Sequence, residues 1–215
     1  MLDRTEVVRI TVAADRATGV VARVPGGEIT VRAPMVALAG GSILSPVVLQ
    51  RSGIAQGVAG RTLHIHPVGA VAGLYPETMA PWSGVPQSVM SDAFAHVAGS
   101  WGFRLEAAPT HPGLPLVTPP LEWRPGQPFE PYLDALKARP MEPNRVLLFT
   151  AHQMSSCRIG HSPKTSVADP EGQVHGVRGL WVTDSSAMPT ASGVNPMLSL
   201  MALAHRTASR MVAAT

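Results

Sequence analysis

The stretch MVALAGGSILSPVVLQRSG, from Met35 to Gly53, decides the fold class of this chain. It opens with a short apolar run, which predicts a strand buried on both faces of a sheet. Two glycines follow, and then Ser45 and Pro46 predict a helix with Ser45 as the N-cap and Pro46 at the first helical position. Gly53 can end that helix. A strand, a glycine turn and a capped helix indicate an α/β fold, and they bring backbone N–H groups close to a phosphate-bearing ligand.

The residues before this stretch predict a β-meander. Three segments rich in β-branched residues, at 5–12, 18–24 and 28–40, are separated by the turn sequences DRATG and PGG. The third segment continues into the apolar run described above. Further strands are expected at 62–75 and 145–151.

The middle of the chain, at 76–143, is rich in proline and holds three of the four tryptophans, Trp82, Trp101 and Trp123. Short strands, such as one at 101–108, and a helix near 131–139 are expected there. We interpret this region as a lid or a surface that faces the substrate.

The composition excludes several classes of protein. Charged residues make up 14% of the chain against 45% hydrophobic ones, which is not typical of a disordered tail. The net charge of +3 comes from scattered residues without a basic stripe, so nucleic-acid binding is not expected. Neither a signal peptide nor an apolar run of membrane-spanning length is present in the sequence. Cys157 is the single cysteine, which excludes an intrachain disulfide and is compatible with a cytoplasmic location.

The last third of the chain contains two linked segments that place polar groups on separate elements. AHQMSSCRIG (151–160) puts His152 at the end of an apolar strand. VHGVRGLWVTDSSAMPTASGVNPMLSLMALA (174–204) predicts a strand, a turn and a long helix, amphipathic to fully buried. Asn195 is the expected N-cap of that helix, with Pro196 at its first position. A pair of polar groups delivered in this way can handle a hydroxyl, one taking its proton and the other orienting its oxygen.

Four of these segments, in this order, resemble the C-terminal part of the glucose–methanol–choline (GMC) oxidoreductases. GGSILSPVVLQRSGIA (40–55) resembles the second signature of the family, with Ala55 where glycine is usual. GRTLHIHP is similar to the segment after that signature, and HQMSSCRIG to the histidine segment, with Ser155 and Ser156 in place of glycine and threonine. VHGVRGLWVTDSSAMP with ASGVNP resembles the closing strand, turn and helix. The sequences AHQM and PTASGVNPMLSLMALAH are most similar to the long-chain fatty alcohol oxidase branch.

The resemblance implies an α/β FAD-binding fold with an antiparallel-sheet substrate domain (α+β). It divides the chain into a partial FAD-binding region at 1–61, a substrate-binding region at 62–150 and a C-terminal segment at 151–215. The family begins with a strand–GxGxxG–helix unit that binds the ADP part of FAD, and no match to that unit occurs in the sequence. The chain is therefore expected to be the C-terminal part of a GMC enzyme, from a gene fragment, a split gene or a wrongly assigned start. A separate N-terminal FAD-binding subunit is a possible partner.

The resemblance also implies the site residues and the reaction, which is the FAD-dependent oxidation of an alcohol to an aldehyde or ketone. His152 would be the base or hydrogen-bond partner of the substrate hydroxyl, and Asn195 would orient its oxygen. Pro196 and Met197 would lie by the flavin, where a helix N-terminus stabilises negative charge on the reduced ring. Asp184 and Ser185 would contact FAD. The partner would be a small-molecule alcohol substrate, for which the resemblance favours a long-chain or apolar one.

Each of these residues also has a purely structural interpretation. His152 could be a hydrogen-bonded core histidine, Asn195 a plain N-cap, and Asp184 an Asx-turn residue. Ser42 and Ser45 are expected to serve a turn and a cap, and Cys157 to be a buried packing thiol. His64 and His66 point to one face of a strand, but no third ligand is evident, so no metal site is predicted. Turn or surface roles are expected for His161, His175 and His205.

The alternative to the catalytic interpretation is a non-catalytic remnant, or a chain that serves only as partner to an N-terminal subunit. A serine hydrolase is not expected, because no G-x-S-x-G motif is present.

Overall fold

The computed structural model describes residues 2–69, 76–77, 89–99, 102–107 and 150–214. The chain forms two compact units, one made of residues 1–67 and 150–215 and the other of residues 68–149. The predicted helix near 131–139 lies outside the described residues, as do 145–149 of the strand predicted at 145–151 and the three tryptophans of the middle region.

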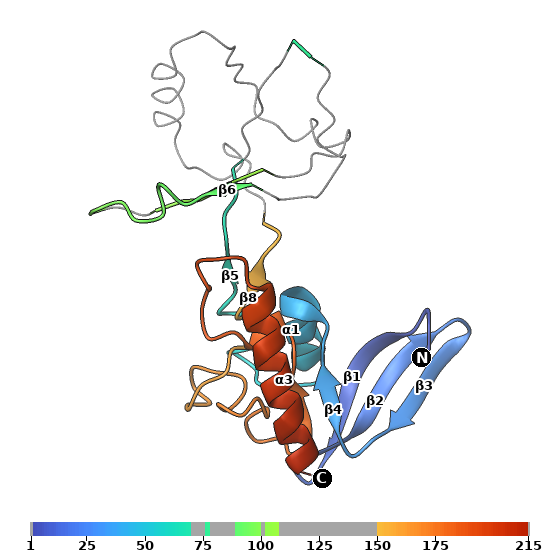
Figure 1. Cartoon of the computed structure of the whole chain (residues 1–215). Helices are drawn as coiled ribbons and strands as arrows, with labels where there is room; N and C mark the ends of the chain where they lie inside the picture. Colours follow the sequence, from blue (N-terminus) through green and yellow to red (C-terminus); the bar gives the residue numbers. More distant parts are fainter. Residues whose placement is uncertain (1, 70–75, 78–88, 100–101, 108–149, 215) are drawn as a thin grey trace. The chain divides into compact units, whose positions relative to one another are not determined.

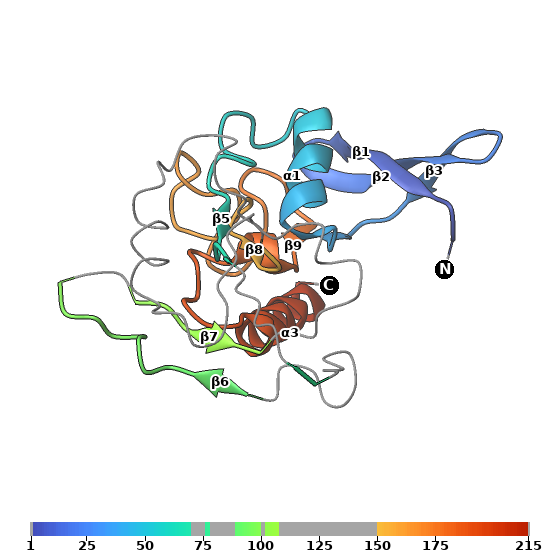
Figure 2. The same ribbon diagram turned by 90° about the horizontal axis from the view of Figure 1, so that it is seen from above.

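The β-meander that the sequence predicts is present in the first unit. Strands β1 (Glu6–Ala13), β2 (Arg16–Val24) and β3 (Gly27–Arg32) form an antiparallel sheet in the order β1-β2-β3. In Figures 1 and 2 this sheet reaches away from helix α3. Gly19 is required in β2, because a Cβ atom there would lie 2.0 Å from the carbonyl oxygen of Val31 in β3.

The prediction of one continuous strand over 28–40 is wrong. β3 ends at Arg32, and a separate short strand, β4 (Val36–Leu38), pairs in parallel with β9 (Leu180–Val182) in another sheet. Pro34 explains the break, because proline has no N–H to continue the β2–β3 ladder. The chain re-forms backbone pairing two residues later, where the Val36 N–H donates to the Gly179 carbonyl oxygen at 2.8 Å.

The prediction that this apolar run is buried on both faces is also wrong. Leu38 is buried, but Val36 is half-buried and Ala37 is exposed. Among the described strands β4 pairs with β9 alone, so one edge of β4 meets no strand in the part of the chain that the structure describes. β9, in contrast, has Leu180, Trp181 and Val182 all buried.

Helix α1 (Gly41–Arg51) starts five residues earlier than predicted, which corrects the assignments of Ser45 and Pro46. The N-cap position is Gly40, and Ser45 and Pro46 lie inside the helix. The sequence could not show this, because the first turn is held by Asp184 from a distant segment, as described below. The predicted end is confirmed: Gly53 follows the C-cap Ser52 with φ of +72°.

Two short strands place the histidines of interest. β5 (His64–Ile65) and β8 (Gln153–Met154) are antiparallel, with His64 opposite Met154, and they lie side by side in both views (Figures 1 and 2). β5 is the described part of the strand expected at 62–75, whose residues 70–75 lie outside the described ones. The His66 N–H donates to the His152 carbonyl oxygen at 3.3 Å and so continues the pairing by one step.

Helix α3 (Met197–Ala213) follows the turn helix η2 (Ser185–Ala187) and confirms the predicted C-terminal helix. The assignment of Asn195 as N-cap and Pro196 as first helical residue is wrong by one position, because Pro196 is the N-cap and makes no side-chain capping bond. The helix is amphipathic rather than fully buried. Thr207 is its buried residue, whereas Leu198 is 75% exposed and Val212 74%.

α3 packs against β9 through its C-terminal half. Arg206 and Arg210 both pair with Glu171, at 3.1 and 2.6 Å. Thr207 lies over Gly172, where a Cβ atom would come within 2.7 Å of the threonine methyl carbon. The core below contains apolar residues from β1, β2, β4, α1, β9 and the loop before β9, including Ile10, Ala17, Leu38, Leu49, Val167 and Leu180.

The second unit contains, among its described residues, the antiparallel pair β6 (Met90–Ser91) and β7 (Leu105–Glu106). The rings of Phe94 and Phe103 stack beside this pair with centroids 5.0 Å apart. In the described part of the chain, no helix is long and apolar enough to cross a membrane.

Candidate active site

The carboxyl ends of β4 and β9 meet at one edge, because these two strands are parallel. Ligands of α/β proteins bind outside the carboxyl ends of such strands. β4 leads into Gly40 and Gly41, and β9 leads into Thr183 and Asp184. The structure therefore brings the glycine turn and the Asp184 turn together, although they are 143 positions apart.

The Asp184 carboxylate joins the two turns. Its Oδ2 accepts hydrogen bonds from the Gly41 N–H at 2.8 Å and from the Ser45 hydroxyl at 2.5 Å. Its Oδ1 accepts from the Ser186 N–H at 2.8 Å and so caps η2. Hydrogen bonds to a charged acceptor are about twice as strong as neutral ones, so this single side chain stabilises the N-termini of both α1 and η2.

Ser42 connects this edge to strand β8. Its hydroxyl donates to the Gln153 carbonyl oxygen at 2.9 Å and lies 3.1 Å from the hydroxyl of Ser185. The Ser155 N–H donates to the Ser185 carbonyl oxygen at 3.1 Å. These bonds place β8, with His152 directly before it, beside the carboxyl ends of the two parallel strands.

His152 contacts a second histidine, His66, which the sequence did not single out as a functional residue. The two Nδ1 atoms are 3.1 Å apart, and the rings meet edge to face with centroids 5.2 Å apart and an interplanar angle of 85°. Both side chains are partly buried. The signal that could have found His66 was its place in the GRTLHIHP segment, just after the second signature.

His66 also contacts the loop that leads into α3. The Gly193 N–H donates to His66 Nε2 at 3.2 Å. The neighbouring Ser192 hydroxyl lies 3.9 Å from the Met154 sulfur and donates to the Val194 carbonyl oxygen. Asn195, Pro196 and Met197 come directly after this loop, so His152 and the start of α3 are joined through His66.

Two departures from the usual family residues lie at strained backbone positions. Ser155 has φ of +71° and Ala55 has φ of +50°. These are left-handed conformations, which glycine adopts without a Cβ penalty. Both residues stand where the family segments usually have glycine. The left-handed backbone at these positions explains why glycine is usual there.

Cys157 is the buried packing thiol that the sequence predicts. Burial raises the pKa of this thiol from 9.0 to about 12, the Ser186 side chain opposes the shift, and the charge of Asp184 adds to it. A nucleophilic cysteine needs a lowered pKa, so Cys157 is not suited to that role.

The remaining histidines have local partners or lie at the surface. His64 Nδ1 is 2.8 Å from the carbonyl oxygen of Thr62 and does not share the contacts of His66. His175 Nε2 lies 3.0 Å from the Ser166 hydroxyl and 3.1 Å from the Gly160 carbonyl oxygen. His161 and His205 are exposed. No group of three or more metal-ligating side chains was found in the described ranges.

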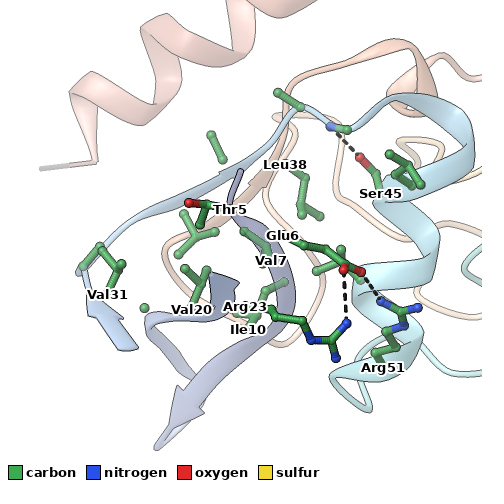
Figure 3. Close-up of a pocket in the computed structure, with 18 of the residues that line it drawn as sticks. Thr5, Glu6, Val7, Ile10, Val20, Arg23, Val31, Leu38, Ser45 and Arg51 are labelled. Carbon is green, nitrogen blue, oxygen red and sulfur yellow. Dashed lines mark hydrogen bonds and ion pairs between the residues drawn. The ribbon is translucent and has the colours of Figure 1, made fainter. Parts of the chain in front are cut away.

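An apolar groove lies between the meander and the β4–α1 unit, and Gly40 and Ser45 are among the residues that line it (Figure 3). It has a volume of about 1120 Å³ and is lined largely by aliphatic side chains such as Val7, Val20 and Leu38. At its rim Glu6 pairs with Arg23 and Arg51, at 3.2 and 3.1 Å. Neither His152 nor Asn195 lines this groove, and its apolar walls suit packing better than chemistry.

The residues at the strand edge and at the start of α3 fit part of a flavin cofactor. A Cβ atom at Gly41 would meet nothing within 4 Å, so the backbone at the carboxyl end of β4 is open to close approach. Met197, in the first turn of α3, is 66% exposed and offers an apolar surface beside a helix N-terminus. Apolar contact together with a positive helix end suits a ring that becomes anionic on reduction.

Comparisons with known proteins identify the family. Two sequence models described as GMC oxidoreductase match residues 1–68 and 130–204, which together are more than half of the chain. The chain belongs to the GMC oxidoreductase family, and this membership indicates FAD as the cofactor.

Similar sequences include uncharacterised and named members of the family. An uncharacterised GMC-type oxidoreductase of Mycobacterium tuberculosis is 27% identical over 96% of this chain and 44% of the relative. A long-chain-alcohol oxidase of Arabidopsis thaliana is 37% identical over 36% of this chain and 11% of that enzyme. The chain spans about half the length of the relatives that it matches over most of its own length.

Solved structures show the same fold. A pyridoxine 4-oxidase from Mesorbium loti matches 96% of this chain and 57% of its own, with a TM-score of 0.57 and 19% identity. A formate oxidase of Aspergillus oryzae matches 97% of this chain and 60% of its own, with a TM-score of 0.60 and 17% identity. The expected mixed α/β fold of the family is thereby confirmed.

Proposed function

We propose that this chain carries the hydroxyl-handling part of a GMC-type alcohol oxidase or dehydrogenase. The reaction converts a CH–OH group to an aldehyde or ketone. One observation supports the proposal above all others: His152 is linked through His66 to the Gly193 backbone, two residues before Asn195. The group expected to take the proton is therefore connected to the loop that leads into Asn195.

The proposed roles follow from the chemistry of each group. FAD, when bound, supplies the acceptor for the hydride that leaves the alcohol carbon. His152 takes or shares the hydroxyl proton, so that the remaining electron pair forms the carbonyl bond. Asn195 has no basic nitrogen, but its amide can hold the oxygen in position. Asp184, Ser185, Pro196 and Met197 are proposed to line the cofactor side of the site.

The proposed substrates are long-chain or other apolar alcohols. The long-chain-alcohol oxidases of Arabidopsis thaliana match about a third of this chain, at 36 to 44% identity. Four large hydrophobic side chains near the start of α3 are exposed: Val194, Met197, Leu198 and Met201. Such a surface would suit an alkyl chain better than a sugar.

The proposal includes a dinucleotide-binding part outside these residues, which would carry the GxGxxG unit. Three features of the described residues support it: the edge of β4 with no strand beside it, the apolar groove, and the exposed apolar side of α3. Parallel strands in α/β proteins are normally covered on both faces. A separate N-terminal FAD-binding subunit would provide this cover. The proposed location is cytoplasmic, with which the lone Cys157 is compatible.

The second candidate is a non-catalytic fragment or subunit of a split GMC enzyme. The exposure of Leu198 and Val212, at 75% and 74%, favours it, because large exposed apolar residues mark an interaction surface or an incomplete fold. In that case the chain alone would be inactive.

The test is the visible absorption spectrum of the full chain after incubation with FAD and desalting. We expect a retained flavin spectrum that a long-chain primary alcohol bleaches without oxygen. His152→Ala should keep the flavin and lose the bleaching, while His161→Ala, at an exposed histidine, should behave like the parent chain. Bleaching that persists in His152→Ala would contradict the assigned role.

A colourless chain separates the two candidates. It would overturn the catalytic proposal for the chain alone and support the split-enzyme alternative. The next measurement would add a purified dinucleotide-binding part from a GMC relative and ask whether flavin binding and bleaching then appear together.

A further inference from the structure

The hydrogen bond from Gly193 fixes the state of His66. A backbone N–H can only donate, so His66 Nε2, 3.2 Å away, must present its lone pair. A neutral imidazole carries one hydrogen, and that hydrogen must then lie on His66 Nδ1.

The hydrogen on His66 Nδ1 in turn fixes the state of His152. This N–H lies within hydrogen-bond distance of His152 Nδ1, at 3.1 Å between the nitrogens, across a ring pair that meets at 85°. His66 therefore donates and His152 Nδ1 accepts. The single hydrogen of neutral His152 must then lie on Nε2.

We propose that His66 is a positioning residue that holds His152 in the tautomer with hydrogen on Nε2. This rests on the proposed function only in taking His152 as the group that meets the substrate hydroxyl. In the resting chain His152 then offers the substrate oxygen a hydrogen-bond donor. It becomes a base at Nε2 only after the protons of the histidine pair are rearranged.

The rearranged state is opposed by the loop before α3. If His152 carried its hydrogen on Nδ1, His66 would accept there and carry its own hydrogen on Nε2. That N–H would face the Gly193 N–H, and two donors cannot bond to each other. Losing a hydrogen bond of this kind disfavours the rearranged state by about tenfold. Proton acceptance by His152 is thereby coupled to the position of Gly193, two residues before Asn195.

The test is nitrogen NMR of the full chain labelled with ¹⁵N-histidine, under conditions in which the imidazoles are neutral. Protonated and unprotonated ring nitrogens resonate in separate regions, so each tautomer is read directly. We expect hydrogen on Nδ1 of His66 and on Nε2 of His152. The result for His66 is the stricter test of the two, because free histidine in water prefers the tautomer with hydrogen on Nε2. His66→Asn and His152→Asn assign the signals.

Two variants of nearly equal shape separate donation from mere packing. Asn at position 66 keeps an N–H donor near the place of Nδ1, so His66→Asn should leave the hydrogen of His152 on Nε2. Asp at the same position can only accept, so His66→Asp should draw the hydrogen onto His152 Nδ1. The tautomer ratio of His152 should differ between the variants by at least about tenfold. His64→Asn, two residues earlier in the same segment, should leave His152 as in the parent chain.

The outcomes decide this inference independently of flavin chemistry. Hydrogen on His66 Nε2 in the parent chain would overturn it, as would the same His152 tautomer in the Asn and Asp variants. If the variants do not fold, the parent spectrum alone decides. A chain that shows the expected tautomers but does not oxidise alcohols would refute the proposed function and leave the role of His66 intact.

Discussion

The turn at Asp184 and the exposed side of helix α3 differ in how many of their partners this chain provides. The turn finds hydrogen-bond partners, whereas the apolar side chains of α3 are left uncovered by the described residues. Asp184 receives two hydrogen bonds from the distant start of α1 and one from Ser186 in its own turn, and Ser186 and Ala187 are buried. Leu198 and Met201, on α3, are 75% and 61% exposed. The carboxylate of this turn and the N–H groups that it accepts from are thus paired within the chain, whereas the apolar covering of α3 is not supplied by the described residues.

The largest expected effect is on the reactivity of the Cys157 thiol, which is buried beside the Asp184 turn. Because the folded pKa of Cys157 is about 12 and the ordinary value is 9.0, the folded chain should hold about a thousandfold less thiolate near pH 8 than the unfolded chain. An aromatic disulfide reagent should react correspondingly slower with the native protein than in urea. Equal rates in the two states would show that this region opens freely.

The same shift predicts how stability depends on pH. The folded state holds the thiol proton more tightly than the unfolded state, so this contribution is complete below pH 9.0 and is lost as pH rises toward about 12. Urea unfolding at several alkaline pH values should show the loss. Cys157→Ala should remove that part of the pH dependence, and an unchanged slope would argue against a raised pKa.

Asp184→Ala should have the next largest effect. It leaves the Gly41 and Ser186 N–H groups without their acceptor, which should lower the free energy of unfolding by about 3 kcal/mol. Urea unfolding measures the loss. Asp184→Asn keeps the shape and one acceptor oxygen and should lose less, while Asp3→Ala, at an exposed position, serves as the control. Equal small losses in all three would mean that the two turns hold without the carboxylate.

Ser155→Gly should stabilise the chain by about 1 kcal/mol. Glycine removes the Cβ strain at φ of +71°, and it also removes a buried hydroxyl that has no hydrogen-bond partner among the described residues. Thermal unfolding measures the change. Ser156→Gly is the matched control, since Ser156 is equally buried but has no positive φ, and it should destabilise the chain through the added freedom of the unfolded state. Destabilisation of similar size in both variants would show that the backbone at Ser155 is not strained.

Leu198→Gln, on the exposed side of α3, should change the free energy of unfolding of this chain by less than about 0.5 kcal/mol, because the side chain is largely exposed already. It should also reduce self-association, measured by light scattering. Thr207→Gln, at the buried position of the same helix, should destabilise the chain by overpacking. A large loss for Leu198→Gln would show that this side of α3 is covered after all.

Much of the fold could be predicted because its signals are local. The strands of the meander, the end of α1 at Gly53 and the C-terminal helix follow from alternation, turn residues and helix periodicity. The error at the start of α1 arose because a distant group replaced a local one. Ser45 has the residue type of an N-cap, but Asp184 supplies the acceptor at that end of α1, so the helix begins at Gly41 instead.

The candidate site was predicted in part for the same reason. His152 and Asn195 were found from family segments, and their catalytic roles remain proposals. His66 was weighed only as a metal ligand together with His64, and its contact with His152 was missed. Sequence spacing shows which face of a strand a side chain takes but not which residue lies opposite. That it meets His152 depends on the pairing of β5 with β8, which joins residues 86 positions apart.

The sequence by itself determined the family, the kinds of element and the residue types available for chemistry, since these depend on local pattern and motif. The tertiary structure decided which groups meet: Asp184 with Gly41, Ser42 with Gln153, and His66 with both His152 and Gly193. Hydrogen bonds act over about 3 Å, and only the folded chain brings residues that are far apart in sequence within that distance. The protonation pattern proposed for the two histidines is therefore a property of the fold.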